Sequence, residues 1–483
     1  MPPASSPGLD DRLARLRFRR ALTLLLMTTL APGSAQLVAG RKDLGRIALR
    51  IWLGLIATAV ALLLLGLVWH GFVFWLVSNT VVLGVVRLVL MALAIGWALL
   101  FVDAWRLGQP LELRQKQRLV MVGINGVLCL SVAGTLLFAS HVVGVQRDFI
   151  ATMFAGEEVS DAEAGRYNVL LLGGDSGAGR SGLRPDSITV ASVDEETGQT
   201  VLFGLPRNMA NFPFPEGSVM DEQFPDGFNC AGCYLNGLST WAVDNADLFE
   251  EYDDPGTEAT IEGIEGITGL EINYYAMVNL AGFRGLVDAV GGVELNVRDR
   301  IPIGGGGGPV TGYIEPGLQR LDGYETLWFA RSRESADDYA RMARQKCVMG
   351  AMLEQLSPQV VMTKFEMIAK ASEDMISTNL PASELDRFMA LAVKAKSRQI
   401  ATVSFVPPLV NTAEPDVAAI HARVQQAIEE SGPRDEGEVK VRQGGPDKKS
   451  APGASRPVTT GGSIGSMSQG YAANDALDLS SAC

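Results

Sequence analysis

The residues best suited to chemistry form an arginine-rich stretch in the last third of the chain. Asp338, Arg341 and Gln345 are spaced i, i+3 and i+7, so on a helix they share one face. Arg331 and Arg333 project to the same side of the chain if their segment is extended. Guanidinium groups bind phosphate oxygens through paired hydrogen bonds and keep their charge. The stretch therefore indicates a site for a phosphate-rich anion, with a helix of surface salt bridges as the alternative.

Two earlier segments carry the same residue types at the ends of expected strands. Asp175 follows an apolar run and two glycines, and Arg184 and Asp186 come about ten residues later. Arg207 follows the third expected strand. Mg²⁺, or Mn²⁺ in its place, prefers oxygen ligands and often takes only one or two carboxylates together with phosphate oxygens. The two aspartates and their neighbouring arginines therefore fit a metal-bound diphosphate, although an aspartate after two glycines is usually a turn residue.

The elements that must position these residues alternate between strands and helices. Apolar runs predict strands at 167–172, 187–193, 200–205, 272–278, 291–297 and 400–406. Helical patterns occur at 236–250, 257–268, 279–289, 322–329, 337–356, 360–373 and 382–396. The glycine run 304–308 is expected to be a flexible loop. This alternation predicts an α/β fold with three α/β/α layers.

The chain before this region is strongly apolar. Three stretches, roughly 50–69, 80–102 and 119–142, are long enough to span a bilayer as helices. The apolar stretch 21–40 contains Pro32 and Gly33 and is expected to be interfacial or re-entrant, not a fourth span. The first fifty residues hold nine lysines and arginines against three acids, and the loop after the second span is also basic. The positive-inside rule therefore places the N-terminus in the cytoplasm and everything after about residue 146 outside the cell membrane.

Composition divides the chain into five parts. These are a basic cytoplasmic segment (1–49), a membrane region (50–146), an acidic linker (147–165), a folded extracellular domain (166–433) and a tail expected to be disordered (434–483). Residues 119–433 contain 43 acids and only 21 lysines and arginines. An acidic domain of this kind does not suit nucleic acid, and the arginine-rich stretch is an exception within it.

Two cysteines lie in a proline- and glycine-rich loop. Cys230 and Cys233 are outside the membrane on the expected topology, where disulfides persist, and we expect a local disulfide that braces the loop. A thioredoxin-type redox pair is the alternative, but it requires a strand before the cysteines and a helix after them. Zinc is disfavoured because there is no second CxxC and no histidine nearby.

Seven segments, taken in order, resemble one known family. They are 167–175 (YNVLLLGGD), 184–187 (RPDS), 205–208 (LPRN), 286–293 (LVDAVGGV), 321–323 (LDG), 330–333 (ARSR) and 338–345 (DYARMARQ). Together they resemble the LytR-CpsA-Psr family over about residues 167–356. The multi-span N-terminus and the cysteine loop are similar to the actinobacterial branch.

The resemblance implies an enzyme that moves a glycopolymer from a polyprenyl diphosphate carrier onto peptidoglycan as a phosphodiester. Carried over by motif, Asp175 and Asp186 would hold magnesium. The residues that would bind the diphosphate are Arg184, Arg207, Arg331, Arg333 and Arg341, supported by Asp338 and Gln345. An actinobacterial setting favours arabinogalactan, with teichoic acid or capsular polysaccharide as alternatives. Asn208 stands where many members have aspartate and lacks the negative charge.

The expected chemistry is direct attack by a sugar hydroxyl on the diphosphate, with an aspartate assisting deprotonation. No histidine lies near the motifs, so a Ser-His-Asp triad is not available. An apolar cavity for the prenyl chain is expected between residues 267–290 and the helices of 347–368. A diphosphate hydrolase (a pyrophosphatase, or this as a side activity) and a non-catalytic lipid-binding scaffold for wall assembly are the alternatives. Arg344 lies about 300° around the helix from Arg341 and has no clear role in the site.

Overall fold

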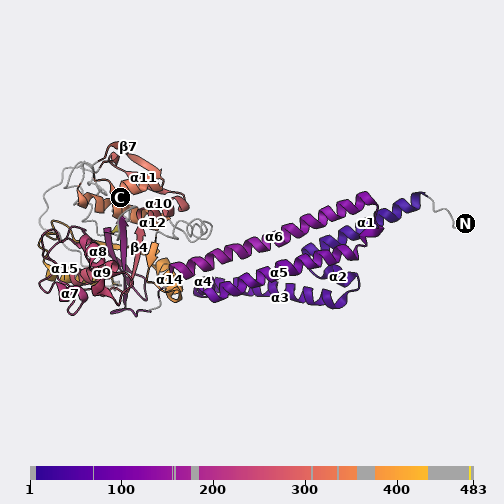
Figure 1. The fold of residues 1–483 in the computed structure, drawn as a ribbon, viewed down its shortest axis with the longest axis horizontal. Coiled ribbons are helices and arrows are strands. Elements are labelled where there is room, and N and C mark those ends of the chain that lie inside the picture. Colours follow the sequence, from indigo (N-terminus) through magenta and orange to yellow (C-terminus); the bar gives the residue numbers. More distant parts are fainter. Residues whose placement is uncertain are drawn as a thin grey trace, which may run out of the picture. The chain divides into compact units, whose positions relative to one another are not determined.

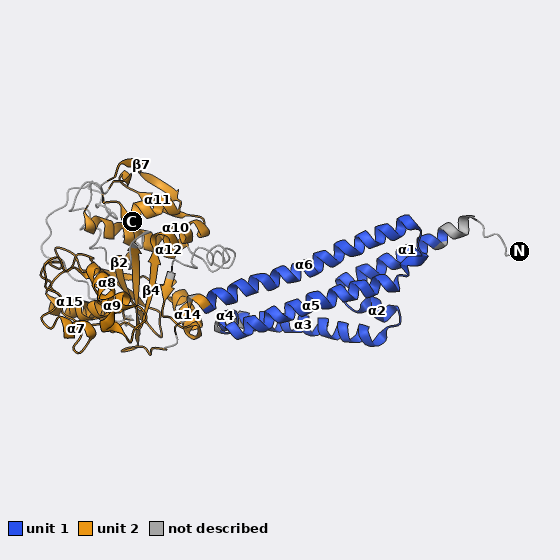
Figure 2. Ribbon diagram, viewed as in Figure 1, with its two compact units in different colours: residues 1–151 blue, residues 152–483 orange. Residues whose placement is uncertain are grey.

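The computed structural model describes residues 7–68, 70–154, 156, 159–175, 184–305, 308–333, 337–355, 376–432 and 478–479. The chain divides into two compact units, residues 1–151 and 152–483, which Figure 2 shows in separate colours. The expected helix at 360–373 and nearly all of the expected disordered tail lie outside the described residues. Each unit is described by itself below.

The first unit consists of helices. They are α1 (Pro7–Leu30), α2 (Ser34–Val38), α3 (Lys42–Val68), α4 (His70–Ser78), α5 (Thr80–Leu107) and α6 (Gln115–Met153). Three helical stretches, in α3, α5 and α6, are long and apolar enough to cross a membrane and include the three stretches expected to do so. The apolar stretch 21–40 forms the end of α1, a turn and α2, where Leu25 and Ala35 pack in one cluster with Phe101 of α5. Its interfacial placement stays a prediction.

The second unit is built around a six-stranded mixed sheet in the order β10-β3-β2-β1-β4-β9. The strands are β1 (Arg166–Asp175), β2 (Arg184–Asp194), β3 (Thr200–Leu205), β4 (Tyr274–Asn279), β9 (Ile376–Thr378) and β10 (Ala401–Ser404). The β1–β4 and β3–β10 pairs are parallel and the other pairs are antiparallel. Two small antiparallel pairs lie outside this sheet: β5 (Val293–Val297) with β8 (Gly317–Leu321), and β6 (Ile301–Gly304) with β7 (Val310–Ile314).

Helices cover both faces of the sheet because successive strand residues point to opposite sides. Leu170 and Leu172 of β1 belong to the core that includes α8 (Leu238–Asp244), α9 (Pro255–Thr268) and α15 (Val417–Ser431). Leu171 lies between them and packs with Met349 on the opposite face. That second face carries α10 (Leu280–Val290), α11 (Gly323–Arg331), α12 (Asp338–Gln355) and α14 (Leu385–Lys396), while α7 (Val219–Gln223) lies near α9 (Figure 1). The predicted three-layer α/β/α class is confirmed.

Helix α9 carries carboxyl groups whose burial makes stability depend on pH. The pKa of Glu258 is raised from 4.5 to about 7 by burial and by the neighbouring charges of Glu262, Glu265 and Asp254. Burial also raises the pKa of Glu265 to about 7. The folded state therefore keeps protons that the unfolded chain loses, so these groups make the protein less stable as pH rises from about 4.5 to about 7.

Replacing Glu258 by glutamine should therefore stabilise the protein above pH 7 and have little effect near pH 4. Glutamine resembles the protonated carboxyl group that the folded state prefers, and we expect a gain of about 1 kcal/mol at pH 8 after solvent screening is allowed for. Thermal unfolding of the full-length protein measured across this pH range tests the effect. Glu250→Gln, at an exposed carboxylate, is the matched control. A stabilisation of equal size at pH 4 and pH 8 would contradict the charge argument.

Candidate functional site

The first part of the site is an irregularity near the end of the β1–β2 ladder. Gly173 pairs with Ser187 and Gly174 pairs with Pro185, which leaves Asp186 as an extra residue of β2. Such a bulge bends the strand and redirects the side chain of the extra residue. It also accommodates the proline, which has no N–H to donate to the ladder.

The same end of the ladder brings two other predicted residues together. Asp175 is the last residue of β1, and its partner across the ladder is Arg184, the first residue of β2. Backbone pairing therefore places Asp175, Arg184 and Asp186 at one end of two adjacent strands.

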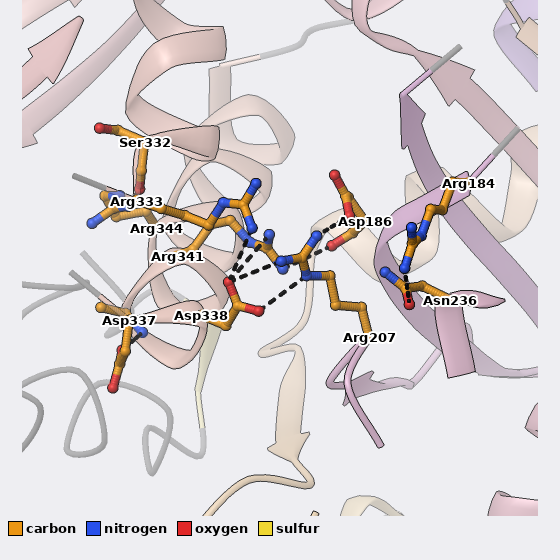
Figure 3. A network of polar contacts seen from close by, with 11 residues as sticks. Arg184, Asp186, Arg207, Asn236, Ser332, Arg333, Asp337, Asp338, Arg341 and Arg344 are labelled. Atoms are coloured by element: carbon orange, nitrogen blue, oxygen red, sulfur yellow. Dashed lines mark hydrogen bonds and ion pairs between the residues drawn. The ribbon is translucent and has the colours of Figure 1, made fainter. Parts of the chain in front are cut away.

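Arg207 joins this end of the sheet to helix α12. It follows β3 and Pro206, and its Nη1 donates to Asp186 Oδ1 at 2.5 Å. Its Nε and Nη2 donate to the two carboxylate oxygens of Asp338 at 3.0 and 3.4 Å. Figure 3 shows Arg207 between the two aspartates. A guanidinium group can make these three bonds at once because its donors point in fixed, divergent directions.

The first turns of α12 supply the other side of the cluster. Asp337 Oδ1 accepts from the backbone N–H of Ala340 at 2.7 Å, which satisfies a free amide at the start of the helix. One turn on, Arg341 Nη1 lies 3.5 Å from Asp338 Oδ1, and Arg333 Nη1 lies 4.0 Å from the same oxygen. Arg341 Nη2 also donates to the backbone oxygen of Asp186 at 3.2 Å. The Asp338 carboxylate thus contacts the guanidinium groups of Arg207, Arg333 and Arg341.

This charge arrangement decides the protonation states. Burial alone would raise the pKa of Asp338, but the charges of Arg341, Arg207 and Arg333 and the Arg207 hydrogen bond outweigh it and lower the pKa. Arg341 is only 2% exposed, and burial lowers its pKa to about 10. At neutral pH the aspartate is therefore an anion and the arginine a cation, so Asp338 is a weak proton acceptor.

A cavity of about 420 Å³ opens beside this cluster, between the sheet and helices α10, α11 and α12. Its apolar lining includes Leu171, Ala276, Val278, Leu280, Phe283, Leu286, Leu327, Val348, Met352 and Leu353. Its polar lining includes Asp186, Arg331, Arg333, Arg341 and Gln345. The expected cavity between residues 267–290 and the helix from 347 is present, with β1, β2 and α11 as further walls, whereas residues 356–375 lie outside the described chain.

Arg331 and Arg333 do not lie together on an extended segment, which was the condition for their side chains to project to the same side. Arg331 is the last residue of α11, where its guanidinium carbon lies 5.1 Å from the ring centroid of Trp328, and Ser332 ends the helix. Helix α11 begins at a capping box formed by Asp322 and Glu325, and its apolar face packs into the core. Both arginines line the cavity, Arg331 from the last position of α11 and Arg333 from two residues further on.

The site also contains Asn236, which the sequence reasoning missed. Its side-chain oxygen accepts from Arg184 Nη2 at 3.2 Å, and its backbone N–H donates to the Arg207 oxygen at 3.0 Å. Asn236 is only 3% exposed and lies three residues after Cys233. The expected Cys230–Cys233 disulfide is present and closes the turn before it. The sequence Leu235-Asn-Gly-Leu238, in which a polar residue lies between two leucines, could have indicated a buried polar side chain at this position.

The sequence matches the LytR_cpsA_psr family over residues 146–427, which is more than half of the chain. The chain belongs to this family. The polyisoprenyl-teichoic acid–peptidoglycan teichoic acid transferase TagU of Oceanobacillus iheyensis is 26% identical over 293 residues, covering 58% of this chain and 81% of that protein. The cell wall biosynthesis protein LcpA of Corynebacterium glutamicum is 24% identical over 354 residues, covering 65% of this chain and 66% of that protein. The crystal structure of Bacillus subtilis TagV is 20% identical, with a TM-score of 0.40, and covers 56% of this chain and 98% of its own.

The exposed carboxylate at the end of the β1–β2 ladder would need oxygen atoms from a ligand or water to complete the coordination of a metal ion. Among the described residues, no group of three or more histidine, cysteine, aspartate or glutamate side chains could hold an ion unaided. Asp186 is 33% exposed and uses Oδ1 for Arg207, while Asp175 ends the neighbouring strand. Mg²⁺ readily combines one or two carboxylates with phosphate oxygens and water, so this donor set suits a diphosphate-bound ion.

Two other polar residues of the family motifs lie outside the charged cluster. Asn208 follows Arg207, and its side-chain oxygen is buried without a hydrogen-bond partner in the described part of the chain. Arg344 shares α12 with Arg341 but donates to backbone oxygens at the end of α11, as Figure 3 shows. Neither residue lines the cavity.

Proposed function

We propose that this protein is a transferase that moves a cell-wall glycopolymer from a polyprenyl diphosphate carrier onto peptidoglycan, making a phosphodiester bond. The single observation that carries the proposal is the cavity, in which Arg331, Arg333 and Arg341 share the lining with a mostly apolar wall. A prenyl diphosphate has this combination of a doubly charged head and a hydrocarbon chain. The names of TagU and of the other relatives support transfer to peptidoglycan.

The reaction is a displacement at phosphorus. A peptidoglycan hydroxyl oxygen forms a bond to the phosphorus that carries the polymer, and the bridging P–O bond of the diphosphate breaks. Polyprenyl phosphate leaves with the bridging oxygen, and the proton of the hydroxyl goes to a carboxylate. Phosphoryl transfer of this kind depends mainly on positioning and charge neutralisation, which the guanidinium groups can supply.

The carboxylates divide between orientation and proton transfer. Asp338 is held by Arg207, Arg333 and Arg341 and its pKa is lowered, so it orients the guanidinium groups and is a poor base. Asp186 and Asp175, at the end of the β1–β2 ladder, are then the candidates to accept the proton or to hold Mg²⁺ or Mn²⁺. A bound divalent cation would neutralise part of the diphosphate charge.

The proposal includes a placement in the cell. The three apolar helices anchor the protein in the cell membrane, and the distribution of basic residues puts the N-terminus in the cytoplasm and the catalytic unit outside, where peptidoglycan lies. Arabinogalactan is the favoured polymer, with teichoic acid and capsular polysaccharide as alternatives.

Arg333→Ala tests the proposal directly. Full-length protein in lipid nanodiscs is given polyprenyl-diphosphate-linked polymer, peptidoglycan and Mg²⁺, and both polymer on peptidoglycan and unlinked polymer phosphate are measured. The unsubstituted protein should link polymer to peptidoglycan, and the variant should be slower by about 100-fold, because one cationic contact to the diphosphate is lost.

The matched control is Arg320→Ala, which removes an exposed arginine that pairs with Glu294 and lies outside the cavity. It should transfer normally. Release of unlinked polymer phosphate, with no polymer on peptidoglycan, by the unsubstituted protein would instead indicate a hydrolase. Prenyl diphosphate binding without either product would indicate a scaffold.

A further inference from the structure

Arg344 is one of the most deeply buried residues of the catalytic unit, with 1% of its surface exposed. It lies on α12 between Arg341 and Gln345, which line the cavity, but its own side chain is not part of the lining and turns to the end of α11. Its Nε donates to the backbone oxygen of Phe329 at 2.7 Å, and its Nη2 donates to that of Ser332. Both acceptors belong to the last turn of α11.

The C-terminal end of a helix is a favourable place for a cation. The last four carbonyl oxygens of a helix have no partner within it, and the helix dipole adds negative potential there. Burial lowers the pKa of Arg344 to about 10, so the side chain is charged at neutral pH. Its charge and two of its donors are thus used to hold the end of α11.

Ser332, at this helix end, is fixed from three directions. Its N–H donates to Trp328 O at 2.9 Å, its Oγ donates to Pro302 O of β6 at 2.9 Å, and its backbone oxygen accepts from Arg344. The residue is buried. The next residue, Arg333, has a half-exposed side chain that lines the cavity and contacts Asp338. The conformation of Ser332 therefore decides where the Arg333 side chain begins.

We propose that Arg344 is a positioning residue that fixes the end of α11 so that Arg333 reaches the diphosphate. The inference rests on the proposed function, since it needs a diphosphate in the cavity. A purely structural arginine would stabilise the fold without acting through one particular neighbour. The two roles differ in whether the effect of Arg344 on binding depends on Arg333.

A double-mutant cycle separates them. Binding of geranylgeranyl diphosphate to full-length protein in detergent micelles with Mg²⁺ is measured by calorimetry for the unsubstituted protein, Arg344→Gln, Arg333→Ala and the double variant. Arg344→Gln should weaken binding about tenfold when Arg333 is present and by less than about twofold when it is absent. Arg344→Lys, which keeps the charge, should lose less affinity than Arg344→Gln, and it replaces the glutamine variant in the cycle if that variant does not fold.

The chain offers a matched control in Arg166. It is also a buried arginine that donates to backbone oxygens, those of Ser192 and Gln199, but it does not line the cavity. Arg166→Gln should lower the melting temperature without changing affinity. If Arg344→Gln weakens binding equally in both backgrounds, or not at all, the positioning role is overturned. If the unsubstituted protein does not bind the probe, the proposed function fails and the inference fails with it.

Discussion

Arg207→Ala should reduce transfer of polymer by about 1,000-fold, the larger end of the effect expected for removing one preorganised charged donor. Arg207 makes ion pairs with the carboxylates of both Asp186 in the sheet and Asp338 in α12. Hydrogen bonds to both aspartates keep its pKa raised in spite of burial. Removing it deletes a cation and leaves two carboxylates facing each other without the group between them.

Arg207→Lys should recover little of this loss. A single ammonium group cannot reproduce the three divergent N–H bonds to Asp186 and Asp338. The measurement is kcat/KM for transfer by full-length protein in nanodiscs, with thermal unfolding as the check on folding. Arg300→Ala, at an exposed arginine that pairs with Glu315, is the control. Near-normal activity of the lysine variant would show that only the charge matters and would contradict the geometric role.

The sequence predicts those parts of the fold whose pattern is local. Three strongly apolar stretches of sufficient length predict the membrane helices, and the alternation of apolar runs predicts β1 to β4. The spacing of Asp338 and Arg341 predicts their contact, because residues three apart on a helix are neighbours. Each of these inferences uses information held within one element.

Other elements were missed for physical reasons. Strands β6, β7 and β8 are only four or five residues long and lie in a glycine-rich region, where two small pairs are stabilised by packing against α10 and α11. Helix α15, by contrast, could have been predicted from the sequence, because the apolar residues Ile420, Val424 and Ala427 recur at helical spacing. All three are buried in the structure.

The site itself depends on contacts that no local pattern contains. Asp186 lies in β2, Arg207 is the second residue after β3, and Asp338 is the first residue of α12. Only the arrangement of these elements in the fold brings the three side chains together. The family resemblance assigned these residues to one site by their motifs but did not predict the hydrogen bonds between them. Arg344 is three residues from Arg341, a spacing that makes the two neighbours on the helix, so helical spacing did not predict that the Arg344 side chain turns to the end of α11.

Asp186→Asn should lower transfer about 1,000-fold while leaving the Arg207 hydrogen bond in place. The amide oxygen of asparagine can still accept from Arg207 Nη1, as Asp186 Oδ1 does. What is lost is the negative charge, which a proton acceptor requires and which strengthens the binding of Mg²⁺. The protein should therefore fold normally, and Asp226→Asn, at an exposed carboxylate, should leave both folding and transfer unchanged.

Metal dependence separates the two uses of this carboxylate. Chelation of divalent cations should abolish transfer by the unsubstituted protein, and Mg²⁺ should restore it. If Asp186 holds the ion, Asp186→Asn should need about 10- to 100-fold more Mg²⁺ for half-maximal transfer and should recover activity as Mg²⁺ rises, because a weakened ligand set is compensated by concentration. If Asp186 is instead the base, excess Mg²⁺ should not rescue the variant, whereas a rising pH should, because the acceptor hydroxyl then loses its proton more readily. Transfer that is unaffected by both chelation and the substitution would contradict a metal role and a base role for Asp186 together.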